Sequence, residues 1–241
     1  MLNEQINRRA TVFINENRMM NNQDLAILNP LMQELALMPS TNKQMTFQIT
    51  PNGLMPIEGL SIDLRSNNDS FKISFGQGRI DILRSKISIE DNLEPIGEFV
   101  SKVQRIITML KQAYPTWTIN RLALCLNVCF DLDKEHLDSS YHKFVVNDSP
   151  NIVEWRLRSV LRKPLSEGND LLVNQVSTIS RSVFQTSFEQ FPLDRILVET
   201  DFNTMVGQDV DFTPQLIASV WEATQTDTLQ LIDEYNKLLT E

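Results

Sequence analysis

The stretch from residue 118 to residue 133 constrains the fold more than any other part of the chain. Its apolar residues alternate with others without interruption: Leu122, Leu124, Leu126, Val128, Phe130 and Leu132. Such a period of two predicts a long β-strand with one face in an apolar core. The segment before it has apolar residues at steps of three and four, which predicts an amphipathic helix that packs on this strand: Ile96, Phe99, Val100, Val103, Ile106, Ile107 and Leu110.

The rest of the chain reads as short alternating segments separated by polar turns. A helix is predicted over 24–38, or from Asn29 because of Pro30, and another over 214–239 with Thr213 as its N-cap. Strands are predicted at 45–49, 60–65, 71–75, 80–89, 153–162, 171–184 and 195–202, whereas residues 1–22 read as a loose arm or one short strand.

Runs of strands with helices between the runs are typical of an α+β fold with antiparallel sheet. We therefore predict mainly antiparallel sheet or sheets, packed by a central helix and a long C-terminal helix. The chain shows no linker rich in glycine or proline, so residues 1–241 are predicted to form a single α+β domain. Two similar halves, 1–115 and 116–241, are the alternative.

The charge of the chain is unevenly distributed. From residue 185 onward there are 11 acidic residues against two basic ones, so the last quarter accounts for the whole formal net charge of −9. No cationic complement to this acidic quarter is evident within it. An acidic chain is a poor general binder of phosphate backbones, and nucleic acid is therefore an improbable partner.

The cysteines and the N-terminus bear on the cellular compartment. Cys125 and Cys129 are four residues apart on one predicted strand, too far for a disulfide between them, so both are expected to be buried structural thiols. The N-terminal residues lack the apolar region of a signal peptide, and no apolar run has the length of a membrane span. We expect a cytoplasmic protein without membrane contact.

The strand at 153–162 carries the candidate binding residues Arg156, Arg158 and Arg162. Alternation places these arginines on the face opposite Trp155 and Leu157, which belong in the core. Arginine binds carboxylate and phosphate groups well, so these three residues are candidates for an anion-binding or acid-binding face, with Arg181 and Lys163 as candidate neighbours. A solvated sheet face is the alternative reading, and the acidic quarter is a candidate counterpart, within the chain or between copies.

Other groups carry weaker signals for chemistry. Glu199 and Asp201 share a strand face, with Asp209 and Asp211 beyond them, and carboxylates at this spacing are compatible with Mg²⁺ or with a solvated edge. The two histidines, His136 and His142, are expected at the surface. The chain has no Walker loop, Rossmann fingerprint, Gly-x-Ser-x-Gly elbow or kinase signature, and we predict neither a cofactor nor a metal site.

Three short segments give the chain a resemblance to a known family. They are Arg-Leu-Ala-Leu-Cys-Leu-Asn at 121–127, Val-Glu-Thr-Asp-Phe at 198–202 and the helical ending at 231–240. Together they resemble a sporadically distributed bacterial family of unknown function, over the C-terminal half. The asparagine is displaced by one position, and Ala123 and Cys125 stand where that family has glycine and a second arginine. The resemblance implies a bacterial protein of this architecture and carries over no catalytic residue.

Three functional hypotheses follow. Because no catalytic constellation is evident, the first is a non-enzymatic interaction or assembly subunit that binds another protein or associates with itself. The alternative is a protein that binds a small anion or a nucleotide through Arg156, Arg158 and Arg162, which requires a concave pocket at those side chains. The second alternative is a metal-dependent hydrolase, which requires Glu199, Asp201 and a further acid to converge.

Overall fold

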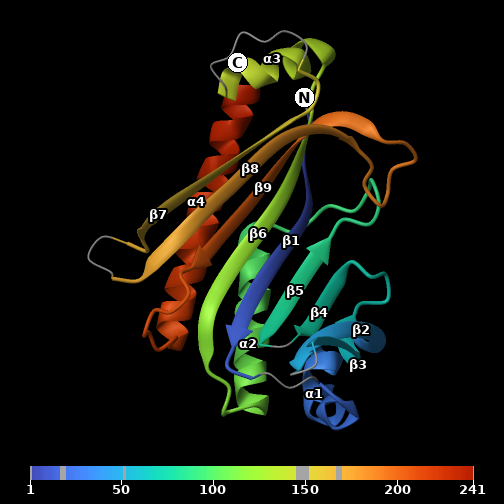
Figure 1. The fold of residues 1–241 in the computed structure, drawn as a ribbon, viewed down its shortest axis with the longest axis vertical. Helices are drawn as coiled ribbons and strands as arrows, with labels where there is room; N and C mark the ends of the chain where they lie inside the picture. The colour runs from blue at the N-terminus through green and yellow to red at the C-terminus, as the bar shows by residue number, and fades with distance from the viewer. Residues whose placement is uncertain are drawn as a thin grey trace.

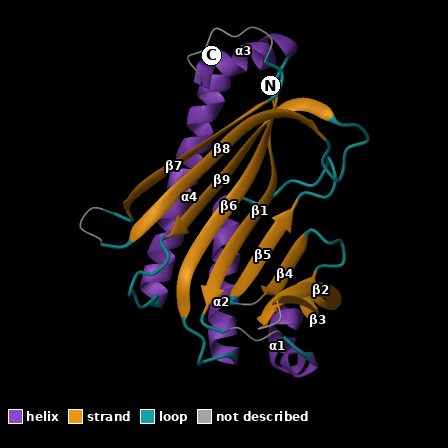
Figure 2. Cartoon of the chain, viewed as in Figure 1, coloured by secondary structure: helices purple, strands orange, loops and turns teal. Residues whose placement is uncertain are grey.

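The computed structural model describes residues 2–16, 20–50, 53–76, 78–144, 152–166 and 170–240. These residues form one nine-stranded antiparallel sheet and four helices (Figures 1 and 2). The strands are β1 (Leu2–Ile14), β2 (Met38–Thr50), β3 (Gly53–Arg65), β4 (Phe71–Gly76), β5 (Arg79–Ser85), β6 (Ile119–Asp131), β7 (Trp155–Pro164), β8 (Leu172–Phe184) and β9 (Leu193–Thr204). The helices are α1 (Asn22–Glu34), α2 (Ile96–Ala113), α3 (Lys134–Phe144) and α4 (Pro214–Thr240).

The strand order in the sheet is β2-β3-β4-β5-β1-β6-β9-β8-β7. Each half of the chain begins with a long strand, continues through a helix and a meander whose last strand pairs back on that first strand, and ends with a helix. In the first half these elements run from β1 to α2, and in the second from β6 to α4. The two first strands, β1 and β6, pair with each other at the centre of the sheet.

All four helices belong to one side of the sheet. In the view of Figure 1, α2 and α4 lie behind the strands, α1 packs on α2, and α3 packs on α4. The seven apolar residues predicted as the stripe of α2 are all buried, and so are Leu122, Leu124, Leu126, Val128 and Phe130 on β6. The face of the sheet that points toward the viewer carries no helix from the described part of the chain.

The predicted α+β fold, with a central helix and a long C-terminal helix on antiparallel sheet, is confirmed. The helix α4 is continuous, and the Oγ1 of Thr213 accepts a hydrogen bond from the N–H of Leu216 at 3.2 Å, as expected of an N-cap. Phe212 and Ile217 are both buried at this end, which fits the packing of a hydrophobic staple. Among the helices that the structure describes, none is both long enough and apolar enough to cross a membrane.

The N-terminal region differs from its prediction as a loose arm or short strand. Residues Leu2–Ile14 form a full central strand between β5 and β6. The helix α1 begins at Asn22, behind a capping box formed by Asn21 and Asp24, and it continues through Pro30 to Glu34. The strands β2 and β3 are also longer than the short segments predicted at 45–49 and 60–65.

The fold yields a direct test of the central strand. Leu124 has no exposed surface and lies between Ala10 of β1 and Phe202 of β9. The substitution Leu124→Asp would bury an unpaired charge there, so we expect the cooperative thermal transition to be lost. Circular dichroism during heating measures this, and Cys125→Ser on the opposite face is the control that should keep the transition. A Leu124→Asp variant that melts like the wild type would show that the strand assignment is wrong.

Candidate functional site

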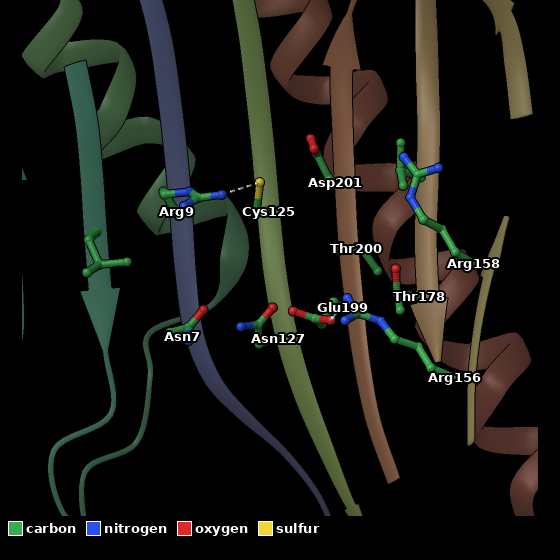
Figure 3. A pocket seen from close by; sticks show the side chains of 12 residues that line it. Asn7, Arg9, Cys125, Asn127, Arg156, Arg158, Thr178, Glu199, Thr200 and Asp201 are labelled. Carbon is green, nitrogen blue, oxygen red and sulfur yellow. Dashed lines mark hydrogen bonds and ion pairs between the residues drawn. The ribbon is translucent and has the colours of Figure 1, made fainter. Parts of the chain in front are cut away.

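The helix-free face of the sheet is polar, because the alternation that buries one side of each strand turns the other side outward. On β6, Leu124 and Leu126 face the helices while Cys125 and Asn127 face the open side. A cavity of about 400 Å³ lies on this open face across β5, β1, β6, β9, β8 and β7 (Figure 3). It is lined by Asn7, Arg9, Leu83, Cys125, Asn127, Arg156, Arg158, Val176, Thr178, Glu199, Thr200 and Asp201.

Two of the three arginines predicted from the sequence line this cavity. Arg156 and Arg158 reach it from β7, whereas Arg162 lies farther along the strand, where its Nε donates to the Oδ1 of Asn174 at 3.1 Å. As the alternation predicts, Trp155 is buried and Leu157 is half-buried on the opposite face. The sheet therefore provides a concave pocket at Arg156 and Arg158.

A third arginine, Arg9, comes from β1 and was missed by the sequence reasoning. It lies directly opposite Cys125 in the strand register, and its Nη2 donates to the Sγ of Cys125 at 3.5 Å. This hydrogen bond, together with the carboxylates of Asp81 and Asp201, raises the pKa of Arg9 above its ordinary value. Because residues 1–22 read as an arm or short strand, nothing in the sequence assigned Arg9 to the face of a central strand.

The two acids proposed as metal ligands, Glu199 and Asp201, face the same cavity from β9. Glu199 pairs with Arg156 at 3.1 Å, and an oxygen of Asp201 accepts from the Nδ2 of Asn203 at 3.0 Å. Asp209 and Asp211 lie in the segment after β9 and do not line the cavity. In the described part of the chain, no three His, Cys, Asp or Glu side chains come together in a way that could hold a metal ion.

Several hydrogen-bond donors in the cavity lack an acceptor among the described residues. Arg158 makes no hydrogen bond or ion pair with them, and the only partner of Arg9 there is the thiol of Cys125. The amides of Asn7 and Asn127 face each other across β1 and β6, and they too have no side-chain partner in this part of the chain. The cavity therefore presents more donors than acceptors.

The thiols of this region are poor nucleophiles. Burial, with a smaller contribution from Asp201, raises the pKa of Cys125 to about 11, and burial raises the pKa of Cys129 to about 12. Both thiols are thus protonated near neutral pH, where a nucleophilic cysteine needs its thiolate.

Two cationic residues expected on the arginine face lie on the opposite side of the sheet, so that expectation is wrong. Arg181 is directly opposite the buried Trp155, and it pairs with Asp194 at 2.8 Å and with Asp138 at 3.1 Å. Lys163 pairs with Asp227 of α4 at 2.8 Å. Both positions follow from the register of β7 and β8, which puts these side chains on the helix-covered face.

The acidic quarter receives cations from other parts of the chain, which agrees with the alternative of a counterpart within the chain. Asp194, Glu199 and Asp227 pair with Arg181, Arg156 and Lys163, respectively, all of which come from β7 or β8. Part of the acidic excess is therefore compensated within the folded chain.

The two histidines lie away from the cavity. His136 is at the start of α3, where its Nδ1 lies 2.8 Å from the Oδ1 of Asp133, and His142 contacts the ring of Tyr141 edge to face. Neither of them lines the pocket on the open face.

No protein-family model matches this chain. The comparison with curated proteins also found no match. The resemblance of three short segments to a bacterial family of unknown function therefore stays a prediction.

The contrast between Arg181 and Arg158 is testable. Arg181 is buried and donates to two carboxylates and to the carbonyl of Leu137 at 3.0 Å, so Arg181→Ala should lower the free energy of unfolding by about 2 kcal/mol or more. Arg158 is exposed, and Arg158→Ala should change the same quantity by less than about 0.5 kcal/mol. Urea denaturation measures both, and equal effects would contradict the assignment of Arg181 to the covered face.

The thiol pKa values predict slow alkylation. For Cys125, a rise from 9.0 to about 11 reduces the thiolate fraction near pH 8 about 100-fold, and the reaction with iodoacetamide should slow accordingly. Mass spectrometry of the native protein against the urea-unfolded chain measures the ratio. Modification of native Cys125 at the rate of the unfolded chain would show that this thiol is more accessible or more acidic than the structure indicates.

Proposed function

We propose that this protein is a non-catalytic binding subunit that holds an anionic group of its partner in the cavity of the open sheet face, between Arg9 and Arg158. The observation that carries the proposal is the surplus of donors around one cavity of about 400 Å³: two guanidinium groups and two amides, for which the thiol of Cys125 is the one acceptor among the described residues. A ligand rich in acceptors, such as a carboxylate or a phosphate, satisfies this surplus.

The charges that line the cavity support this choice. The cavity is lined by three positive side chains, Arg9, Arg156 and Arg158, and by two negative ones, Glu199 and Asp201. Glu199 is already paired with Arg156. The local balance is therefore positive by one charge in a chain whose net charge is −9. A guanidinium group lies at each end of the cavity, and each one can make a forked, bidentate contact with an oxyanion.

The walls of the cavity favour a simple oxyanion over a nucleotide. None of the 12 lining residues is aromatic, so no ring is in place to stack on a nucleobase. The apolar contribution comes from Leu83 and Val176. Carboxylate groups, including those of a protein partner, are the chemistry that these walls fit best.

The proposal predicts that oxyanions stabilise the folded protein. A ligand at about ten times its Kd adds about 1.4 kcal/mol to the free energy of unfolding, which raises the Tm of a chain of this length by about 3–6 °C. We expect citrate and tripolyphosphate to give such a rise in thermal-shift measurements at constant ionic strength. The double variant Arg9→Gln/Arg158→Gln should lose it.

The matched control is Arg162→Gln, on the same strand and the same face but outside the cavity, which should respond like the wild type. Comparison of ATP with tripolyphosphate tests the nucleotide alternative, since a larger shift with ATP would require recognition of the nucleoside. Equal shifts in the wild type and the double variant would overturn the proposed site.

A further inference from the structure

The strand that carries the arginines, β7, is the last strand of the sheet. It pairs with β8 over its ten residues, and no described segment pairs with its other side. In an antiparallel edge strand, about half of the backbone N–H and C=O groups point away from the single neighbour. The outer side of β7, visible in Figure 1, therefore offers a row of unpaired backbone groups to another extended segment.

The side chains of β7 differ between its two faces. On the open face, Arg156, Arg158 and Arg162 follow one another with Val160 between them, and Val160 is 49% exposed. On the helix side, Leu161 is 56% exposed. An edge with arginines on one face and an uncovered leucine on the other is suited to a strand that is acidic on one face and apolar on the other.

We propose that β7 accepts an added β-strand from a partner protein, an extended segment with carboxylates at alternate positions and apolar residues between them. The inference rests on the proposed function in that Arg158 serves both. The carboxylates lie beside Arg158 and Arg162, which have no carboxylate partner among the described residues, and the apolar residues cover Leu161. Main-chain pairing supplies affinity and the alternating side chains supply specificity.

A second copy of this chain fits the same edge poorly. When two identical edge strands pair about a twofold axis perpendicular to the sheet, their equivalent faces lie on the same side. The arginines of both copies would then be neighbours, and like charges across a strand pair are destabilising. Charged side chains on an edge strand commonly prevent such self-pairing. Because the charged side chains on the open face of β7 are positive, an acidic strand is the compatible partner.

The binding test uses the full chain and a fluorescein-labelled ten-residue peptide of alternating glutamate and valine. Fluorescence anisotropy should show saturable binding near 0.1 M ionic strength, and a lysine–valine peptide should bind at least about tenfold more weakly. The variant Arg158→Glu/Arg162→Glu should weaken binding of the glutamate peptide by about tenfold or more. The charge-matched control Arg105→Glu/Lys237→Glu, on α2 and α4, should retain it.

Backbone pairing is tested by N-methylation of the peptide. In a strand, the N–H groups of alternate residues point to opposite edges, so methylation of all glutamates blocks one edge and methylation of all valines blocks the other. We expect one of these two peptides to lose binding and the other to retain it. Equal affinity of both methylated peptides with the parent would show that charge alone holds the peptide, and strand addition would be wrong.

Failure of this inference is distinguishable from failure of the proposed function. If small oxyanions stabilise the wild type but both N-methylated peptides bind as well as the parent peptide, the cavity site is supported and strand addition is wrong. If only one N-methylated peptide binds, if this binding persists in Arg9→Gln, and if oxyanions do not stabilise the wild type, then strand addition is supported and the cavity site is wrong. A stable dimer by light scattering that Arg158→Glu/Arg162→Glu dissociates would identify a second copy as the occupant and overturn the acidic partner.

Discussion

The pairing of β1 with β6 is the contact on which the rest of the sheet depends, because each of these strands starts one half of the chain. Its register places Ala10 opposite Leu124 under the helices and Arg9 opposite Cys125 on the open side. A slip of one residue would exchange these faces and put polar groups into the core. The burial that stabilises the fold therefore also fixes which side chains line the cavity.

The same alternation gives neighbouring arginines different roles. Arg8 is buried on the helix side, where its Nε donates to the Oε1 of Gln5 at 2.9 Å and its Nη1 donates to the carbonyl of Glu94. Burial lowers the pKa of Arg8, although Glu94 partly offsets this effect. Arg9, one residue later, is exposed in the cavity. The contrast between Arg181 and Arg158 repeats this pattern near the β7 edge of the sheet, where the buried arginine is anchored by carboxylates and the exposed one lines the cavity.

The parts of the fold that the sequence predicts well are those with strong apolar periodicity, namely β6, α2 and α4. The strand β1 was not predicted because a bulge between Gln5 and Asn7 interrupts its alternation and brings Gln5 and Arg8 to the helix-facing side. Only Ala10, Val12 and Ile14 mark its period of two. The site was predicted in parts: alternation identified the outward arginines of β7 and the outward acids of β9 as separate candidates. These arginines and acids share one cavity because the strands are ordered β6-β9-β8-β7 in the sheet. Strand order is a tertiary property that no local sequence pattern encodes.

The distribution of charge bears on how an acidic partner would meet this surface. The chain as a whole carries a net charge of −9, so at long range it repels anions, whereas the arginines of the open face attract them at short range. At about 0.1 M salt the Debye length is about 10 Å. The salt therefore screens most of the repulsion from distant negative charges, whereas the attraction between groups in contact within the cavity is screened much less. Such an arrangement does not accelerate encounter by steering, as a uniformly basic surface does. Discrimination then depends on geometry at close range, where the register of β7, β1 and β6 has placed the donors.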